Sequence, residues 1–130
     1  MEPQFLSLDE VLEIHQQQIE IYGGLQGVRD PAALESAVAT PQATFGGDLL
    51  HPSIPAMAAA YLFHLCRNHP FIDGNKRAGA NAAITFLLVN EWDLELGSDE
   101  LVDLVVDVAS GKLGKPELTQ IFETRCRPAY

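Results

Sequence analysis

The stretch RNHPFIDGNKR, from Arg67 to Arg77, brings together a histidine, an aspartate, two asparagines and three cations. Histidine titrates near neutrality and can take a proton from an attacking hydroxyl, which predicts that role for His69. The carboxylate of Asp73 is the hard oxygen ligand that Mg²⁺ prefers. These groups together suit the binding and transfer of a phosphate from a triphosphate such as ATP, with Mg²⁺ as its metal.

The residues after Asp73 are typical of a helix start. Asp73-Gly74 is a turn signal and Asn75 is a natural cap, so Lys76 and Arg77 should open a helix. The free amides of a helix N-terminus attract anions. Lys76 and Arg77 are unfavourable there unless an anion compensates them, so we expect both, together with Arg67, to face a phosphate.

Other interpretations of this stretch stay open. An Asp-Gly turn next to Lys and Arg also fits a solvated loop, and a histidine before proline can be purely structural. His64 and His69 could suggest zinc, but no Cys/His ligand spacing supports it.

The elements that must position these residues are helical. Ser7 and Glu10 form a capping box before an amphipathic segment, and Asp30-Pro31 is a cap followed by proline at the first helical position. Two segments that are apolar almost all round flank the stretch and should be buried. The helices expected are 8–22, 31–38, 54–67, 76–89, 99–110 and 116–125, the fifth of them capped by Ser98.

The chain, residues 1–130, is therefore expected to be one compact all-α domain of about six helices around two buried central helices. Phe71 and Ile72 should anchor the loop to the core. His15 is expected on the surface of the first helix, and residues 41–53 form a loop. WDLEL, residues 92–96, is the only short candidate for a strand.

The composition of the chain argues against several classes of function. The net charge is −10, which argues against direct binding of nucleic acid, because phosphate backbones need a basic surface. We find no signal peptide and no apolar run long enough to span a membrane, and two cysteines make no disulfide framework. Cys66 is expected to be a buried free thiol, and the location is expected to be cytoplasmic. Four cations near the end of the sequence should be solvated: Lys112, Lys115, Arg125 and Arg127.

The run from His69 to Arg77 resembles the signature of the Fic/Doc superfamily, H-x-F-x-[D/E]-G-N-G-R-x-x-R. Lys76 stands where most Fic proteins have glycine, and Ala80 stands where they have the final arginine. Both departures resemble the Doc branch, the death-on-curing toxins. The segments IYGGLQGVRDP, NAAITFLL and LVDLVVDVASGKL are also Doc-like in order and spacing.

The Doc resemblance implies a toxin of a toxin–antitoxin pair that acts as a protein kinase. Such an enzyme transfers the terminal phosphate of ATP to a threonine of elongation factor Tu and blocks translation. Some Fic proteins carry a built-in inhibitory helix, which residues 119–124 match only in part, so the resemblance implies a separate Phd-like antitoxin. Two alternatives remain: a Fic-type enzyme that transfers AMP to a protein hydroxyl, and a catalytically silent module that binds nucleotide or antitoxin.

The resemblance also implies roles for single residues. His69 resembles the general base, and Asp73 resembles the Mg²⁺ ligand. The loop 43–50 resembles the flap that aligns a target segment. The positions that resemble the phosphate- and nucleotide-binding group are Gly74, Asn75, Lys76, Arg77, Arg67 and Asn81, although an exposed helix position explains Asn81 equally well.

Overall fold

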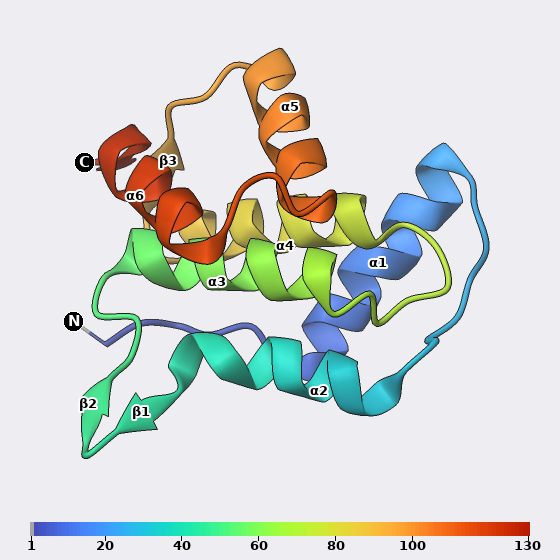
Figure 1. Ribbon diagram of the computed structural model, residues 1–130, viewed down its shortest axis with the longest axis horizontal. Coiled ribbons are helices and arrows are strands. Elements are labelled where there is room, and N and C mark those ends of the chain that lie inside the picture. Colours follow the sequence, from blue (N-terminus) through green and yellow to red (C-terminus); the bar gives the residue numbers. More distant parts are fainter. Residues whose placement is uncertain (1) are drawn as a thin grey trace.

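The computed structural model describes residues 2–130, which fold into six α-helices and two small two-stranded sheets (Figure 1). The helices are α1 (Leu8–Tyr22), α2 (Pro31–Ala39), α3 (Ile54–Arg67), α4 (Asn75–Val89), α5 (Ser98–Ala109) and α6 (Lys115–Arg125), with a 3-10 turn, Thr40–Gln42, after α2. The strands β1 (Thr44–Phe45) and β2 (Asp48–Leu49) pair with each other, as do β3 (Trp92–Leu94) and β4 (Cys126–Pro128). The all-α prediction of about six helices is confirmed.

Side-chain caps fix where the first three helices begin. Ser7 and Glu10 exchange hydrogen bonds as a capping box at α1. Asp30 caps α2 through Ala33 N–H, and Ser53 caps α3 through Ala56 N–H. At α5 the prediction was off by one residue, because Gly97 takes the cap position and Ser98 is already helical.

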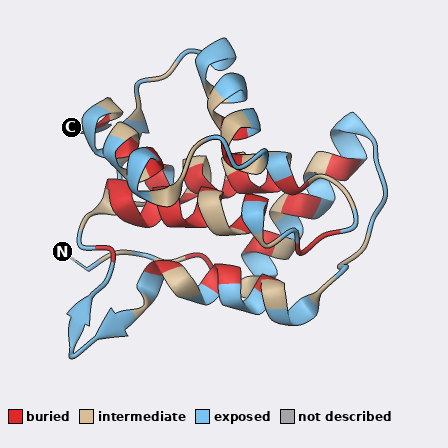
Figure 2. Cartoon of the chain, viewed as in Figure 1, coloured by how far each residue is buried: buried red, intermediate tan, exposed pale blue. Residues whose placement is uncertain are grey.

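The two central helices, α3 and α4, form an antiparallel pair in the middle of the molecule, with α5 and α6 on one side and α2 on the other (Figure 1). The buried residues concentrate on this pair (Figure 2). Their close approach depends on Gly79, where a Cβ would lie 3.0 Å from Cys66 Sγ and 3.1 Å from the Leu62 carbonyl oxygen. Cys66 is a buried free thiol, as expected.

The short strands lie next to the ends of the two central helices. Strand β3 lies within the predicted strand segment and pairs antiparallel with β4, which joins the chain after α6 to the end of α4. The β1–β2 hairpin occupies part of the predicted loop and leads into the beginning of α3. Within residues 2–130 no helix is both long and apolar enough to cross a bilayer.

Three predictions about single side chains were wrong. Ile72 does not anchor the motif segment to the core as Phe71 does, because its side chain is 47% exposed. His15 is only 3% exposed, because it belongs to the face of α1 that packs under the loop between α3 and α4. Lys115 is half-buried and donates a hydrogen bond to His64. Lys115 is the first residue of α6, and α6 packs on α3. The ammonium group of Lys115 therefore lies against α3 and does not extend freely into water.

Candidate active site

The motif loop, which we define as Asn68 to Gly74, joins the two central helices and borders a cavity of about 210 Å³. Five predicted site residues line this cavity together: His69, Asp73, Gly74, Asn75 and Lys76. Cys66, Ile72 and Ala109 complete its wall. Its volume is below the roughly 300 Å³ of the smaller ligand pockets, so it suits the phosphate end of a nucleotide rather than a whole one.

His69 is held in an unusual backbone conformation, with φ of 51° in the left-handed region. The following proline disfavours right-handed helical angles, as expected, but the residue is left-handed rather than extended. The Arg29 side chain stabilises this bend, because Nε donates to the His69 carbonyl at 2.7 Å and Nη2 to the Asn68 carbonyl at 3.1 Å. Arg29 was not predicted as a site residue.

Asn75 is the first residue of α4 and is 6% exposed, whereas the cap position belongs to Gly74. Its Oδ1 accepts Phe71 N–H at 2.9 Å, and its Nδ2 donates to the Phe71 carbonyl at 3.0 Å. This pair of bonds fixes the amide orientation and points Nδ2 at His69 Nδ1, 3.1 Å away. Nδ1 then accepts a hydrogen bond, so the neutral imidazole carries its proton on Nε2.

The Asp73 carboxylate is fixed at both oxygens. Oδ2 accepts Leu25 N–H at 3.2 Å and Oδ1 accepts Gly74 N–H at 2.9 Å. These two bonds, followed by the nearby Arg77 charge, lower the pKa of Asp73 below its usual value, so the group is ionised at neutral pH. Each oxygen keeps a further lone pair for a cation.

This donor set fits Mg²⁺ bound mainly through substrate and water. Residues 2–130 contain no group of three His, Cys, Asp or Glu side chains placed to hold a metal ion. A single carboxylate beside a phosphate pocket is a common way for proteins to bind this ion, whose other ligands are phosphate oxygens and water. Asp73 is the residue that would hold it.

The first turn of α4 faces the cavity as an open helix N-terminus. Gly74 takes the cap position with φ of 78°, and no side chain within residues 2–130 caps this turn. The side chain of Lys76, the second residue of the helix, is exposed at the rim of the cavity. Amides and an ammonium group beside one small cavity can bind an anion.

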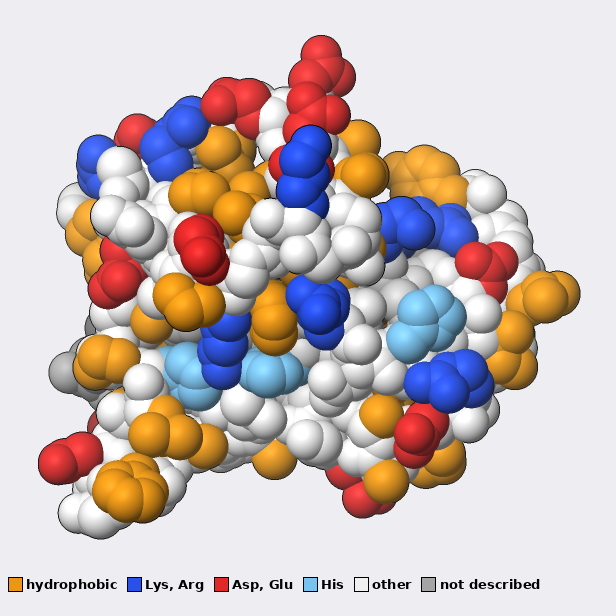
Figure 3. Space-filling view, viewed as in Figure 1, with side chains coloured by type: hydrophobic (Ala, Val, Ile, Leu, Met, Phe, Trp, Pro, Cys, Tyr) orange, Lys and Arg blue, Asp and Glu red, His pale blue; other side chains and the backbone are white. Residues whose placement is uncertain are grey.

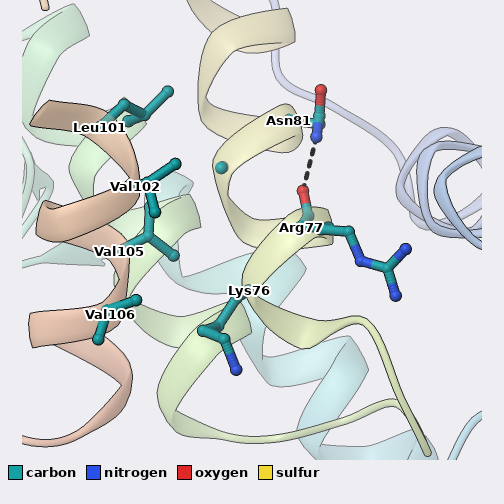
Figure 4. A pocket seen from close by; sticks show the side chains of 8 residues that line it. Lys76, Arg77, Asn81, Leu101, Val102, Val105 and Val106 are labelled. Atoms are coloured by element: carbon teal, nitrogen blue, oxygen red, sulfur yellow. Dashed lines mark hydrogen bonds between the residues drawn. The ribbon is translucent and has the colours of Figure 1, made fainter. Parts of the chain in front are cut away.

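The three predicted cations do not converge on this cavity. Arg77 Nη1 donates to the Gln18 carbonyl of α1 at 3.2 Å, and its side chain points away from α5 (Figure 4). The Arg67 guanidinium lies over the Phe63 ring, 5.4 Å from its centroid. Asn81 Nδ2 donates to the Arg77 carbonyl at 2.8 Å, one turn earlier in the same helix (Figure 4).

A second hollow lies between α4 and α5. Leu101, Val102, Val105 and Val106 of α5 face α4 across a cavity of about 250 Å³ (Figure 4). Lys76, Arg77, Ala80 and Asn81 form its other side. Val102 and Val106 are 60% and 47% exposed, so the groove presents apolar surface at the surface of the domain.

The segment 23–30, and not the hairpin, lies against the motif loop. Val28 and Phe71 form an antiparallel bridge, and Ile72 N–H donates to the Gly27 carbonyl at 3.1 Å. The predicted flap, 43–50, is at the beginning of α3, whereas the motif loop follows the end of that helix. The expectation that 43–50 aligns a target segment at the site does not fit this arrangement, because α3 separates the hairpin from His69.

His15, like Arg29, is a site residue that sequence reasoning missed. Its ring stacks on Phe71 with centroids 3.7 Å apart, and Nε2 lies 2.7 Å from the Asp73 carbonyl oxygen. The buried residues of α1 are Val11, His15 and Ile19, spaced four apart. That period was a usable signal, because a histidine on a buried stripe is expected to have a partner.

A polar loop between two buried antiparallel helices, with an open helix N-terminus at its end, is the defining feature of this helical domain. The chain belongs to the Fic/DOC family, whose model matches residues 5–87, from before α1 to most of α4. The resemblance found in the sequence is thus confirmed.

Two relatives support the Doc branch. The chain is 44% identical over 91 residues to Toxin Doc of Mycolicibacterium smegmatis, which covers 68% of this chain and 70% of that protein. It is 34% identical over 108 residues to Protein kinase doc of Escherichia phage P1, which covers 83% of this chain and 84% of that protein. The chain is therefore a homologue of Doc proteins.

Proposed function

We propose that this protein is a Doc-type toxin that transfers the terminal phosphate of ATP to a threonine of a translation factor of the elongation factor Tu class. One observation carries the proposal: His69, Asp73 and Lys76 line the same cavity at the open N-terminus of α4. A relative named as a protein kinase, 34% identical over 83% of the chain, supports phosphate transfer.

Different residues of the chain bind the phosphates and the metal ion in this proposal. The amides of Asn75, Lys76 and Arg77 in the first turn of α4 and the ammonium group of Lys76 bind the phosphates, and Asp73 holds Mg²⁺. The bound ion would neutralise developing phosphate charge. Since transfer depends mainly on positioning and charge neutralisation, a cavity that fits only the phosphate end is sufficient for these steps.

His69 is the residue that takes the proton of the target hydroxyl. At rest its Nδ1 accepts a hydrogen bond from Asn75 and Nε2 carries the proton. The ring can take up a proton only at a nitrogen that carries none, so either Asn75 Nδ2 must release Nδ1, or the ring proton must move to Nδ1 and free Nε2. Binding of substrate must supply this change.

Lys76 is the residue that selects which phosphate moves. Glycine at this position would let a diphosphate lie directly on the backbone. The lysine side chain fills that space and brings its own charge, so the nucleotide binds with its terminal phosphate towards the nucleophile.

The groove between α4 and α5 is the site that we assign to an antitoxin of the Phd-like class. Four apolar side chains of α5 face it, and Lys76 lies at one end. An amphipathic segment with an acidic residue would match both features. Lys76 also lines the phosphate cavity. An antitoxin bound in the groove beside Lys76 would therefore obstruct that cavity.

The distribution of charge on the surface fits a protein target better than a nucleic acid. Lys and Arg form separate patches on the face in Figure 3, with acidic side chains between several of them. The net charge of −10 would oppose a phosphate backbone.

One incubation tests the proposal. The protein is mixed with Mg²⁺, ATP and elongation factor Tu, and the factor is weighed by mass spectrometry. We expect a gain of one phosphate on a threonine, and none with His69→Asn, since asparagine tolerates the left-handed backbone better than alanine does. A gain of AMP would indicate the adenylyl-transferring alternative. An unchanged mass, with wild type and His69→Asn equally harmless in cells, would indicate the silent module.

A further inference from the structure

His15 of α1 lies directly beneath the motif loop, although 58 residues separate it from Asp73. The ring is 3% exposed and nearly coplanar with Phe71, at an interplanar angle of 2°. Its Nε2 lies 2.7 Å from the Asp73 carbonyl oxygen, and a carbonyl can only accept, so Nε2 must carry a proton.

The Asp73 carbonyl that accepts the hydrogen bond from His15 belongs to a peptide unit whose N–H also orients the Asp73 carboxylate. The carbonyl of Asp73 and the N–H of Gly74 are the two ends of one planar group. The Gly74 N–H donates to Asp73 Oδ1 at 2.9 Å. Any rotation of this peptide unit therefore moves the donor that orients the carboxylate, and the bond from His15 opposes such rotation.

Glycine makes this peptide unit easy to rotate. Gly74 has φ of 78°, in the left-handed region, where glycine also has low-energy alternatives. Addition of a Cβ at Gly74 would bring it 2.9 Å from Ile19 Cδ1 and 3.5 Å from His15 Nε2. The His15 bond is the contact from α1 that acts directly on this peptide unit.

We propose that His15 is a positioning residue for the Asp73 carboxylate: its Nε2–H holds the Asp73–Gly74 peptide unit so that the carboxylate points into the phosphate cavity. The role for Mg²⁺ within this inference rests on the proposed function. The hydrogen-bond network itself is independent of that function.

Two substitutions separate positioning from packing. His15→Phe keeps an aromatic ring on Phe71 and removes the donor. His15→Gln keeps a donor and removes the ring. If the bond positions Asp73, His15→Phe should raise the Mg²⁺ concentration for half-maximal phosphate transfer on the order of tenfold, as loss of a supporting partner of a metal ligand does. His15→Gln should restore most of that change, even though it loses the stack. His64→Phe, the same change at a half-buried histidine that does not line the cavity, should leave the Mg²⁺ dependence as in the wild type.

Amide hydrogen exchange provides a readout that needs neither ATP nor activity. His15→Phe should accelerate exchange of Gly74 N–H and Leu25 N–H, the two donors to Asp73, at least about tenfold, while amides in the middle of α3 stay protected. Unchanged exchange at both amides, or a Mg²⁺ dependence like that of the wild type in an active His15→Phe protein, would overturn the proposal.

If a variant fails to fold, a measurement on the wild-type protein still tests the proposal. Its ring-nitrogen NMR spectrum should show Nε2 of His15 protonated at neutral pH, and an unprotonated Nε2 would overturn the proposal. Wild-type protein that transfers no phosphate would instead refute the proposed function, and the exchange data on Gly74 would still decide the role of His15.

Discussion

The ammonium group of Lys115, at the start of α6, lies 2.9 Å from Nε2 of His64 in α3. An ammonium group can only donate, so Nε2 must accept and the imidazole is neutral. Burial, followed by the charges of Lys115 and His51, lowers the pKa of His64 to about 4. Three basic groups, on α3, on α6 and in the segment before α3, thus lie close together in an acidic protein.

This contact predicts that the protein loses stability in mild acid. The pKa of His64 falls from 6.5 in the unfolded chain to about 4 in the fold, so between these values the unfolded state binds more protons. The stabilisation is complete above about pH 6.5 and is lost as the pH falls to about 4. We expect a loss on the order of 2 kcal/mol in the free energy of unfolding, which is less than the full pKa shift corresponds to because solvent screens this half-buried group. Urea titrations at several pH values measure it. His64→Phe should show a smaller slope, and an equal slope would contradict the prediction.

The Asn75 amide predicts which nitrogen of His69 is protonated. Wild-type spectra above neutral pH should show the proton on Nε2, because Nδ1 accepts from Asn75. Asn75→Asp places an acceptor beside Nδ1 and should move the proton there. Nitrogen-15 NMR of the His69 ring distinguishes the two forms. If the tautomer is the same in both proteins, Asn75 does not control it.

Lys76 provides a test of which phosphate moves. Lys76→Gly should lower phosphate transfer on the order of a hundredfold, since one charge at the phosphates is lost. It should also open the space in which a diphosphate could lie on the backbone, so that AMP transfer becomes detectable by mass spectrometry. Lys76→Ala removes the same charge without giving glycine's space, and it should lose activity without gaining AMP transfer. AMP transfer by both variants would show that the backbone space is not the cause.

Gly24 should be the least replaceable of the glycines in segment 23–30. Its φ is 124°, and a Cβ there would lie 2.6 Å from Asp73 Oδ2. We expect Gly24→Ala to cost about 2 kcal/mol or more of stability and to impair Mg²⁺ binding. Gly23→Ala is the matched control, because Gly23 also has positive φ but nothing within 4 Å of the added Cβ. It should cost about 1 kcal/mol by thermal unfolding and leave the Mg²⁺ dependence intact. Equal losses of activity in both variants would contradict a specific contact with Asp73.

The sequence predicted the helices well because their signals are local. Ser7, Asp30 and Ser53 each cap a helix where the pattern placed it. The helix start at Gly74 was placed within one residue, since a glycine in the left-handed region can take the cap position that Asn75 was expected to fill.

The environment of the site was harder to predict because its partners are distant in the chain. His15, Arg29 and Leu25 contact the motif loop across 40 residues or more, and no local spacing relates them to it. The direction of Arg77 towards Gln18 was likewise hidden, since residue type gives charge but not orientation.

The hairpin β1–β2 and the motif loop lie at opposite ends of α3, whose 14 residues span about 21 Å. The turn between the two strands, Gly46–Gly47, has open space around both residues. An affinity tag or a fluorophore inserted there would fix the protein to a sensor surface or report on it in solution while the phosphate cavity stays accessible. The hairpin thus offers an attachment point for single-molecule or surface-based measurements on the intact chain.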